Sequence, residues 1–391
     1  MKRHLWTLDD DVSFLNHGSF GACPREVLQV QRAFQDQMEA EPVRFFVREL
    51  EPMVAEVRRK VAAFVGADPD DLVFVRNATE GVNGVLRSLP FEAGDEILLT
   101  DHGYNAVANC VRWLADRVGV VPKVVTIPFP LSSPAQVTDA ILAGVSERTR
   151  LAFVDHVTSP TGIVLPVKEI VAALKARGVE TLVDGAHGPG MVDLDLRDLG
   201  AAYYTGNFHK WICAPKGVAM LHARPDRQEG LVPAVLSHGY NSPRERSRFL
   251  ETFDWTGTAD PSALLSVPAA LAFVEREFGG WGTLRTRNRA LLRRGRDLLC
   301  ETLGCEAPVP DAMLGFLAAL PIPDGVDTPP QSALYLDALQ LALYETHRVE
   351  VPIVPWPAPP KRLIRISAMA YNEDADYDAL ARALREELSI R

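Results

Sequence analysis

A lysine between two apolar runs is the residue of this sequence best placed for covalent chemistry. Lys210 follows the apolar and aromatic run at residues 201–204 and precedes a second apolar run at residues 218–221. The two runs predict buried strands, with Lys210 on the short connection between them. A lysine among apolar neighbours has a lowered pKa and can be a neutral nucleophile near pH 7, as Schiff-base formation with an aldehyde requires. Taken alone, Lys210 fits an ordinary solvated loop better than a catalytic position, because most lysines lie on the surface.

An aspartate upstream of Lys210 makes the chemistry more specific. Residues 180–183 predict a buried strand that ends at Asp184. The carboxyl end of a parallel strand faces the ligand crevice of an open α/β sheet, and a carboxylate there keeps a pyridine nitrogen protonated. A Schiff-base lysine with an aspartate partner for the ring nitrogen is the pattern expected for pyridoxal 5'-phosphate (PLP). The alternative is an aspartate that only caps a turn.

Six short motifs, spread over nearly the whole chain, carry a resemblance to a known family. In chain order they are residues 16–21 (NHGSFG), 77–81 (NATEG), 155–162 (DHVTSPTG), 184–187 (DGAH), 206–211 (GNFHKW) and 365–372 (RISAMAYN). The sequence resembles the fold-type I PLP-dependent enzymes of the class V aminotransferase superfamily, in the isopenicillin N epimerase-like branch. The resemblance implies PLP as cofactor and an α/β, type I PLP-dependent transferase fold. That fold has a mainly parallel sheet in a large domain and a smaller α+β C-terminal domain.

Local patterns predict elements and boundaries consistent with that fold. We expect residues 1–23 to line the site, residues 24–262 to form the large PLP-binding domain and residues 263–391 to form the small domain. A helical pattern runs over residues 24–64, with breaks near residues 41–42 and 51–52. Further strands are expected at residues 72–75, 96–100, 121–126, 150–154, 314–320, 349–354 and 362–367, and further helices at residues 134–144, 167–175, 263–278, 281–303, 331–346 and 373–388.

Composition excludes several classes of function. The chain has 391 residues and a formal net charge of -10, which argues against a nucleic-acid surface. No apolar run is long enough for a membrane-spanning helix, and the N-terminal residues lack a signal-peptide core. The 5 cysteines are scattered without a Cys-x-x-Cys pair, so neither a disulfide framework nor a metal site is predicted. A cytoplasmic location fits best.

The phosphate of the cofactor has a predicted cradle at a helix start. Asn77 is a candidate cap, and the backbone N–H groups at Ala78 and Thr79, with the Thr79 hydroxyl, would hold a phosphate at the positive end of the helix. Every capped helix has this chemistry, so the signal alone is weak. The resemblance implies that Asn207 and His209 also lie on the phosphate side.

The resemblance implies further contacts to the cofactor ring. His187 is expected near its phenolic oxygen. Thr158 and Ser159 stand where many relatives have asparagine, and a hydroxyl there can still donate to the ring oxygen. His102 matches the stacking ring by spacing, which leaves Tyr104 as the candidate proton donor on the exposed face, although either residue could instead only cap or pack.

Another expectation concerns the assembly. The resemblance implies that Thr258 reaches the phosphate of a partner chain, which would make the protein a homodimer. The alternative for Thr258 is a plain capping turn before the helix that follows.

The substrate is expected to be an amino acid. Arg365 lies on an otherwise apolar strand and needs an anionic partner, because an unpaired buried charge is costly. Its planar fork matches an α-carboxylate, although a structural salt bridge would satisfy it too. By resemblance, Asn16 and His17 return to the site near the substrate, and His17 is a second candidate for the acid opposite Lys210.

Several reactions share this predicted core. Cysteine desulfurases carry a nucleophilic cysteine before the arginine strand, but residues 347–363 contain none. By branch resemblance an amino-acid epimerase or racemase ranks first. A C–S β-lyase of the ergothioneine-pathway type and a class V aminotransferase are the alternatives. A non-catalytic PLP-fold regulator is a fourth hypothesis, and the intact Lys210, Asp184 and Arg365 argue against it.

Overall fold

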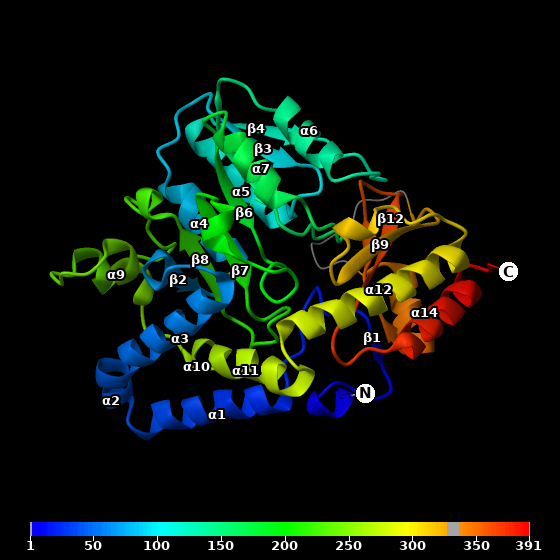
Figure 1. Ribbon diagram of the computed structural model, residues 1–391, viewed down its shortest axis with the longest axis horizontal. Coiled ribbons are helices and arrows are strands. Elements are labelled where there is room, and N and C mark those ends of the chain that lie inside the picture. The colour runs from blue at the N-terminus through cyan, green and yellow to red at the C-terminus, as the bar shows by residue number, and fades with distance from the viewer. Residues whose placement is uncertain (1, 327–335, 391) are drawn as a thin grey trace.

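A seven-stranded sheet forms the centre of the larger part of the molecule (Figure 1). The computed structural model describes residues 2–326 and 336–390. The strand order is β2-β8-β7-β6-β5-β3-β4, and only β8 runs antiparallel to its neighbours, which confirms the mainly parallel sheet. The strands are β2 (Leu72–Val75), β3 (Glu96–Thr100), β4 (Val121–Val125), β5 (Thr149–Asp155), β6 (Glu180–Asp184), β7 (Tyr203–Asn207) and β8 (Ala219–Ala223).

The alternation of side chains along β5 shows which helices cover each face of the sheet. Along β5, Phe153 packs in the same cluster as apolar residues of α4 (Ala78–Ser88) and α5 (Asn105–Val118), whereas Val154 packs with those of α6 (Ala135–Ala143) and α7 (Val167–Lys175). Successive side chains of a strand point to opposite faces, so the continuous apolar runs predicted from sequence are strands buried on both faces.

A second, smaller sheet lies apart from the first (Figure 1). Strands β9 (Leu317–Ile322), β12 (Arg362–Ser367) and β11 (Ile353–Pro355) are antiparallel in the order β11-β12-β9. Helices α12 (Trp281–Leu303), α13 (Ala338–His347) and α14 (Asp374–Glu387) belong to this part of the chain. The N-terminal strand β1 (Ser13–Phe14) joins it by pairing in parallel with β10 (Val349–Glu350). This brings the first residues of the chain to the junction between the two sheets.

The remaining helices of the larger part are α1 (Arg25–Ala40), α2 (Pro42–Arg44), α3 (Leu50–Val65), α8 (Leu196–Leu199), α9 (Arg248–Asp254), α10 (Ser262–Leu265) and α11 (Val267–Phe278), with a π-helical segment at Phe45–Glu49. Of these, α1, α2, α3, α10 and α11 lie along the lower side of the larger part in Figure 1, and α9 lies at its left. Pro52 lies in the first turn of α3, where proline is tolerated, so the helix break expected there does not occur.

Two sequence predictions remain partly open in the fold. Helix α11 packs against α1 and α3, so the predicted boundary between residues 262 and 263 stays a prediction. Of the helix expected at residues 331–346, residues 331–335 lie outside the described residues, and α13 begins at Ala338. Within the described part of the chain, no helix is both long and apolar enough to cross a membrane.

Candidate active site

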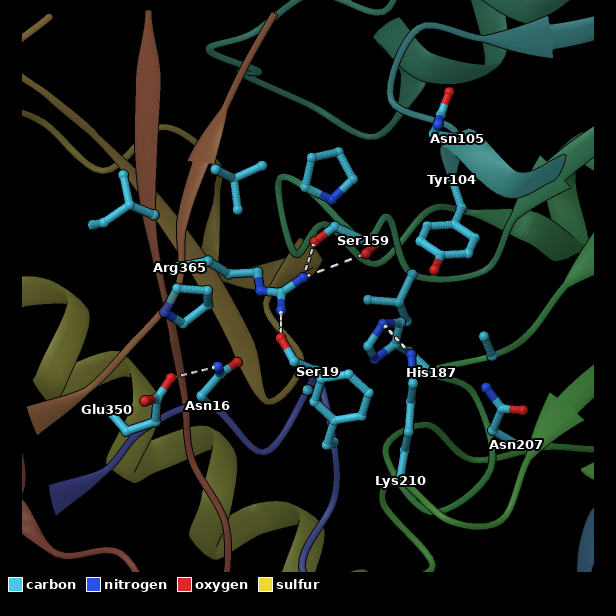
Figure 2. Close-up of a pocket in the computed structure, with 18 of the residues that line it drawn as sticks. Asn16, Ser19, Tyr104, Asn105, Ser159, His187, Asn207, Lys210, Glu350 and Arg365 are labelled. Atoms are coloured by element: carbon cyan, nitrogen blue, oxygen red, sulfur yellow. Dashed lines mark hydrogen bonds between the residues drawn. The ribbon is translucent and has the colours of Figure 1, made fainter. Parts of the chain in front are cut away.

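A cavity of about 1370 Å³ opens at the carboxyl ends of the parallel strands, where open α/β sheets bind ligands. The N-terminal segment, the ends of the main-sheet strands and the small sheet all contribute to its wall (Figure 2). The predicted site residues that line it are Asn16, Ala78, Thr79, Tyr104, Ser159, Asp184, His187, Asn207, His209, Lys210 and Arg365. The fold therefore assembles one site from residues that are far apart in sequence.

Lys210 lies on the connection between β7 and β8, and its amine faces the cavity (Figure 2). Its Nζ is 3.0 Å from Nε2 of His187, and the indole N–H of Trp211 donates to Nδ1 of His187 at 3.2 Å. Because an indole N–H can only donate, Nδ1 must accept, and a neutral His187 carries its proton on Nε2. The imidazole therefore donates to a neutral Lys210 amine.

The charge state of Lys210 follows from its surroundings. Burial, with a smaller contribution from the charge of Arg365, lowers the pKa of Lys210 to about 7, and Asp184 opposes this shift. Burial also lowers the pKa of His187 well below its usual value. Near neutral pH a large fraction of Lys210 is therefore the uncharged amine that attacks an aldehyde.

This lowered pKa predicts how the stability of the cofactor-free protein depends on pH. An unfolded lysine titrates near 10.5 and the folded Lys210 near 7, so the folded state is progressively destabilised as pH falls between these values. We expect Lys210→Met to raise the Tm of the cofactor-free protein, most below pH 7 and not above pH 10.5. Thermal melts from pH 6 to 11 measure the effect. The exposed Lys216, replaced in the same way, is the matched control for the loss of a lysine side chain.

Asp184 ends β6 and is buried at the floor of the cavity. The backbone N–H of Ala186 donates to its Oδ1 at 2.8 Å. Burial raises the pKa of Asp184, while the Ala186 N–H and the charge of Lys210 lower it. A cationic ligand group at this position would favour the ionised carboxylate further.

The start of α4 forms another wall of the cavity. Asn77 caps the helix, accepting from the Glu80 N–H at 2.9 Å. The Ala78 N–H donates to Oδ1 of Asn207 at 2.8 Å, which ties α4 to the end of β7. Gly81 allows this close approach, since a Cβ there would lie 2.7 Å from the Thr205 side chain. The positive helix end and the Thr79 side chain thus face the cavity beside His209.

These groups match the parts of PLP. A neutral amine suits its aldehyde, a buried carboxylate suits its pyridine nitrogen, and a capped helix end suits its phosphate. The residues that would hold it are Lys210, Asp184 and Thr79, with the Asn207 and Ala78 pair beside them. The donor set therefore fits the cofactor that the sequence predicts.

Arg365 provides the cationic wall of the cavity (Figure 2). Its guanidinium donates to the Ser159 carbonyl oxygen and, at 2.8 Å, to the Ser19 hydroxyl, and its Nε has no hydrogen-bond partner. Within the described residues no carboxylate forms an ion pair with it, and burial lowers its pKa to about 10. Because a buried guanidinium without an anion is costly, the structure favours an anionic group of the ligand over the structural salt bridge.

The structure corrects the placement of two histidines. The His102 ring does not line the cavity as a stacking group: it is buried against Trp356, with Nδ1 2.8 Å from the Thr161 hydroxyl. His17 does not face the substrate space either. Its imidazole lies beneath Lys210, 2.9 Å from that residue's carbonyl oxygen and 2.7 Å from the Tyr371 hydroxyl. Burial lowers the pKa of His17 to about 4, so it is also poorly suited as the second acid.

Two predicted hydroxyl contacts also need revision or remain open. Thr158 is fully buried and bonds to the Thr161 hydroxyl at 2.7 Å and to the Ile163 N–H at 2.9 Å, so Ser159 alone of this pair lines the cavity. Thr258 is exposed and lies outside the cavity of its own chain. Its role across a dimer interface stays a prediction.

Sequence reasoning missed several groups of the cavity wall. Ser19 belongs to the motif at residues 16–21, but nothing in the neighbouring sequence indicated that its hydroxyl would accept a hydrogen bond from Arg365. Glu350 accepts from the Asn16 amide at 2.9 Å (Figure 2), and a separation of 334 residues left no local signal. Asp155 ends a buried strand in the same way as Asp184, and that pattern could have identified it.

Comparison with known proteins gives a consistent set of similarities. The family described as aminotransferase class-V matches residues 16–380. The chain is 36% identical over 390 residues to isopenicillin N epimerase of Streptomyces clavuligerus, covering 96% of this chain and 95% of that protein. It is 33% identical over 399 residues to the probable chloroplastic L-cysteine desulfhydrase of Arabidopsis thaliana, covering 96% and 83%. Among solved structures, the cystine C–S lyase C-DES with cysteine persulfide has a TM-score of 0.79 at 23% identity, covering 96% and 97%.

Proposed function

The chain belongs to the aminotransferase class-V family of PLP-dependent enzymes, and we propose that it is an amino-acid epimerase that inverts configuration at the α-carbon. PLP supplies the electron sink that labilises a bond at that carbon, and the protein decides which bond breaks and where the proton returns. Inversion requires a proton to leave one face of the α-carbon and another to arrive on the opposite face.

The observation that carries this proposal is the opposed placement of Tyr104 and Lys210. In Figure 2 the Tyr104 hydroxyl and the Lys210 amine enter the same space from opposite sides of the cavity. Lys210 is suited to remove the α-proton, because its pKa is lowered to about 7 and a large fraction of it is uncharged near neutral pH. The Tyr104 hydroxyl is suited to donate a proton from the other side. Similarity of 36% and 37% to two isopenicillin N epimerases supports the same reaction.

The remaining groups are assigned supporting roles. Arg365 binds the α-carboxylate and thereby fixes which face of the α-carbon meets Lys210. Asp184 would hold the ring nitrogen, and His187 keeps the Lys210 amine oriented through its Nε2 proton. The start of α4, with Thr79, binds the phosphate.

A β-eliminating C–S lyase is the second candidate. Its support is the similarity to L-cysteine desulfhydrases, which extends over 96% of this chain in the Arabidopsis protein. No cysteine of the described residues lines the cavity, which argues against transfer of sulfur to a protein thiol. Transamination is a third outcome of the same core chemistry.

We also propose a cytoplasmic homodimer in which Thr258 contacts the partner's phosphate. The exposure of Thr258 outside its own cavity supports a contact beyond its own chain.

The reaction can be identified from products and from isotope incorporation. Holoenzyme is incubated in D₂O with isopenicillin N and, separately, with L-cysteine. An epimerase gives α-deuterated material of both configurations without keto acid or ammonia. Release of pyruvate, ammonia and sulfide from L-cysteine instead establishes the lyase.

Replacing Tyr104 by phenylalanine should uncouple exchange from inversion. We expect Tyr104→Phe to lower the rate of inversion by about 10²- to 10⁴-fold, while α-deuterium still enters with retention through Lys210. Tyr344 lines the same cavity and packs on Arg348, so Tyr344→Phe is the matched control. Inversion at the wild-type rate in Tyr104→Phe would contradict the assigned role.

A further inference from the structure

A second buried carboxylate lies beside Asp184 and has no role in the chemistry above. Asp155 ends β5 as Asp184 ends β6, and the two are register partners in the parallel pair. Both line the cavity, and their exposed fractions are 3% and 4%. Two residues earlier on each strand, Phe153 and Leu182 pack in one cluster with α4 and α5. Asp155 and Asp184 therefore point to the same face of the sheet, on strands about 4.8 Å apart.

The surroundings of Asp155 offer it no cation. Within the described residues no ion pair reaches Asp155, and its Oδ2 is buried without a hydrogen-bond partner. This oxygen lies against Gly103, where a Cβ would be 3.6 Å away. Burial raises the pKa of Asp155, and the charge of Asp184, the titratable group that faces it on β6, raises this pKa further. Tyr104 lies after the end of β3, and a hydrogen bond from its backbone lowers the pKa of Asp155.

Other titratable groups near this end of the sheet are already engaged. The His102 imidazole is turned to the Thr161 hydroxyl and to the Ile127 carbonyl oxygen. Asp101 accepts from the Ile127 N–H at 2.9 Å. Lys210 acts on Asp184, the other member of the pair. Two adjacent carboxylates in a site of low dielectric cannot both ionise cheaply, so one of them retains its proton.

We propose that Asp155 is a positioning residue that stays a neutral acid beside Asp184, so that the pair presents one negative charge and one proton to the ring-nitrogen side of the cofactor. Asp184 is the ionised member, because it accepts the Ala186 N–H and a cationic ring nitrogen beside it would favour its carboxylate. The neutral Asp155 excludes water from the space beside Asp184 and adds no second charge. This inference rests on PLP as the cofactor and is independent of whether the reaction is epimerisation.

The protonation of Asp155 can be observed directly in the holoenzyme. Infrared spectra at pH 7 should show the C=O stretch of a protonated carboxyl group, which moves in D₂O and disappears in Asp155→Asn. The control is Asp101→Asn, because Asp101 lines the same cavity and should leave the band in place. A wild-type spectrum without the band, or a band that survives in Asp155→Asn, overturns the proposal.

Cofactor affinity separates this positioning role from a structural one. Asparagine resembles the neutral acid in size and polarity, whereas alanine opens the space to water. We therefore expect Asp155→Asn to keep the Kd of PLP within about threefold of wild type at pH 7 and Asp155→Ala to raise it about tenfold or more. Equal losses in both variants would mean that an ionised Asp155 is needed. No change in either would mean that Asp155 is a spectator.

A third measurement uses the full chain without cofactor. The raised pKa of Asp155 means that the folded state binds this proton more tightly than the unfolded state. Its contribution to stability is therefore lost as pH rises through the folded pKa. Tm should fall less steeply with rising pH in Asp155→Asn than in wild type, and parallel curves overturn the proposal. No amino-acid substrate is present in these three experiments, so failure of the epimerase assignment leaves their outcomes unaffected.

Discussion

Replacing Lys210 by alanine is expected to lower turnover by about 10⁴-fold or more and to leave the cofactor without a covalent link to the protein. Lys210 Nζ is the amine of the cavity wall that accepts a hydrogen bond from the Nε2–H of His187, and burial lowers its pKa to about 7. No other lysine of the described residues lines the cavity. In the proposed mechanism, alanine therefore removes both the attachment point and the base that takes the α-proton.

Borohydride reduction followed by peptide mapping measures the first effect, and turnover under saturating PLP measures the second. In wild type the reduced cofactor should be found on the peptide that contains Lys210, and in Lys210→Ala on none. Lys216 is exposed, and Lys216→Ala should keep both properties. Recovery of the label on another wild-type lysine would sink the proposed mechanism, even with the fold unchanged.

The two central residues could be predicted because their positions depend on local patterns. Lys210 lies between two apolar runs that are strands in the structure, and Asp184 ends a run that is buried on both faces. The carboxyl ends of parallel strands meet at one edge of the sheet, so the two were expected in one cleft without knowledge of the rest of the fold.

Side-chain direction in the loops after the strands could not be predicted in the same way. His102 and Tyr104 are two residues apart, and only the tertiary structure decides which one faces the cavity. Trp356, from the other end of the chain, packs on the His102 ring at 4.6 Å between ring centroids. This contact holds His102 in the core, while Tyr104, at the start of α5, keeps 46% of its surface exposed at the cavity mouth.

The same limit applies to His17, whose partners are separated from it by 193 and 354 residues. A sequence motif could bring His17 to the site, but not show that its ring lies under the Lys210 backbone. Asp155 is a different case. Its pattern, a buried strand that ends at an aspartate, is the one that identified Asp184, so local sequence information is sufficient to find it.

Replacing Arg365 is expected to have the second largest effect. The guanidinium is buried, its two anchors are the neutral Ser159 carbonyl and Ser19 hydroxyl, and its Nε is unpaired. A substrate carboxylate would supply the missing charge through two charge-assisted hydrogen bonds. Loss of such a pair in Arg365→Ala should lower kcat/KM by about 10²- to 10⁴-fold, mainly through KM.

Graded variants test whether the carboxylate is what Arg365 recognises. Arg365→Lys keeps the charge without the planar fork and should fall between wild type and alanine. Ser19→Ala removes one anchor and should cost about 2- to 10-fold. Lys361 precedes the same strand, is exposed and pairs with Asp324, so Lys361→Ala should leave KM unchanged.

The decisive comparison uses two ligands that differ in one group. Binding of L-cysteine and of cysteamine, which lacks the carboxylate, is followed by the change in cofactor absorption. Wild type should prefer L-cysteine strongly, and Arg365→Ala should bind the two about equally, because the interaction that distinguishes them is gone. If Arg365→Ala keeps the full preference, the carboxylate is held elsewhere and Arg365 serves only to join the N-terminal segment to the Ser159 loop. Because binding is measured and not turnover, this result holds for an epimerase, a lyase or a transaminase alike.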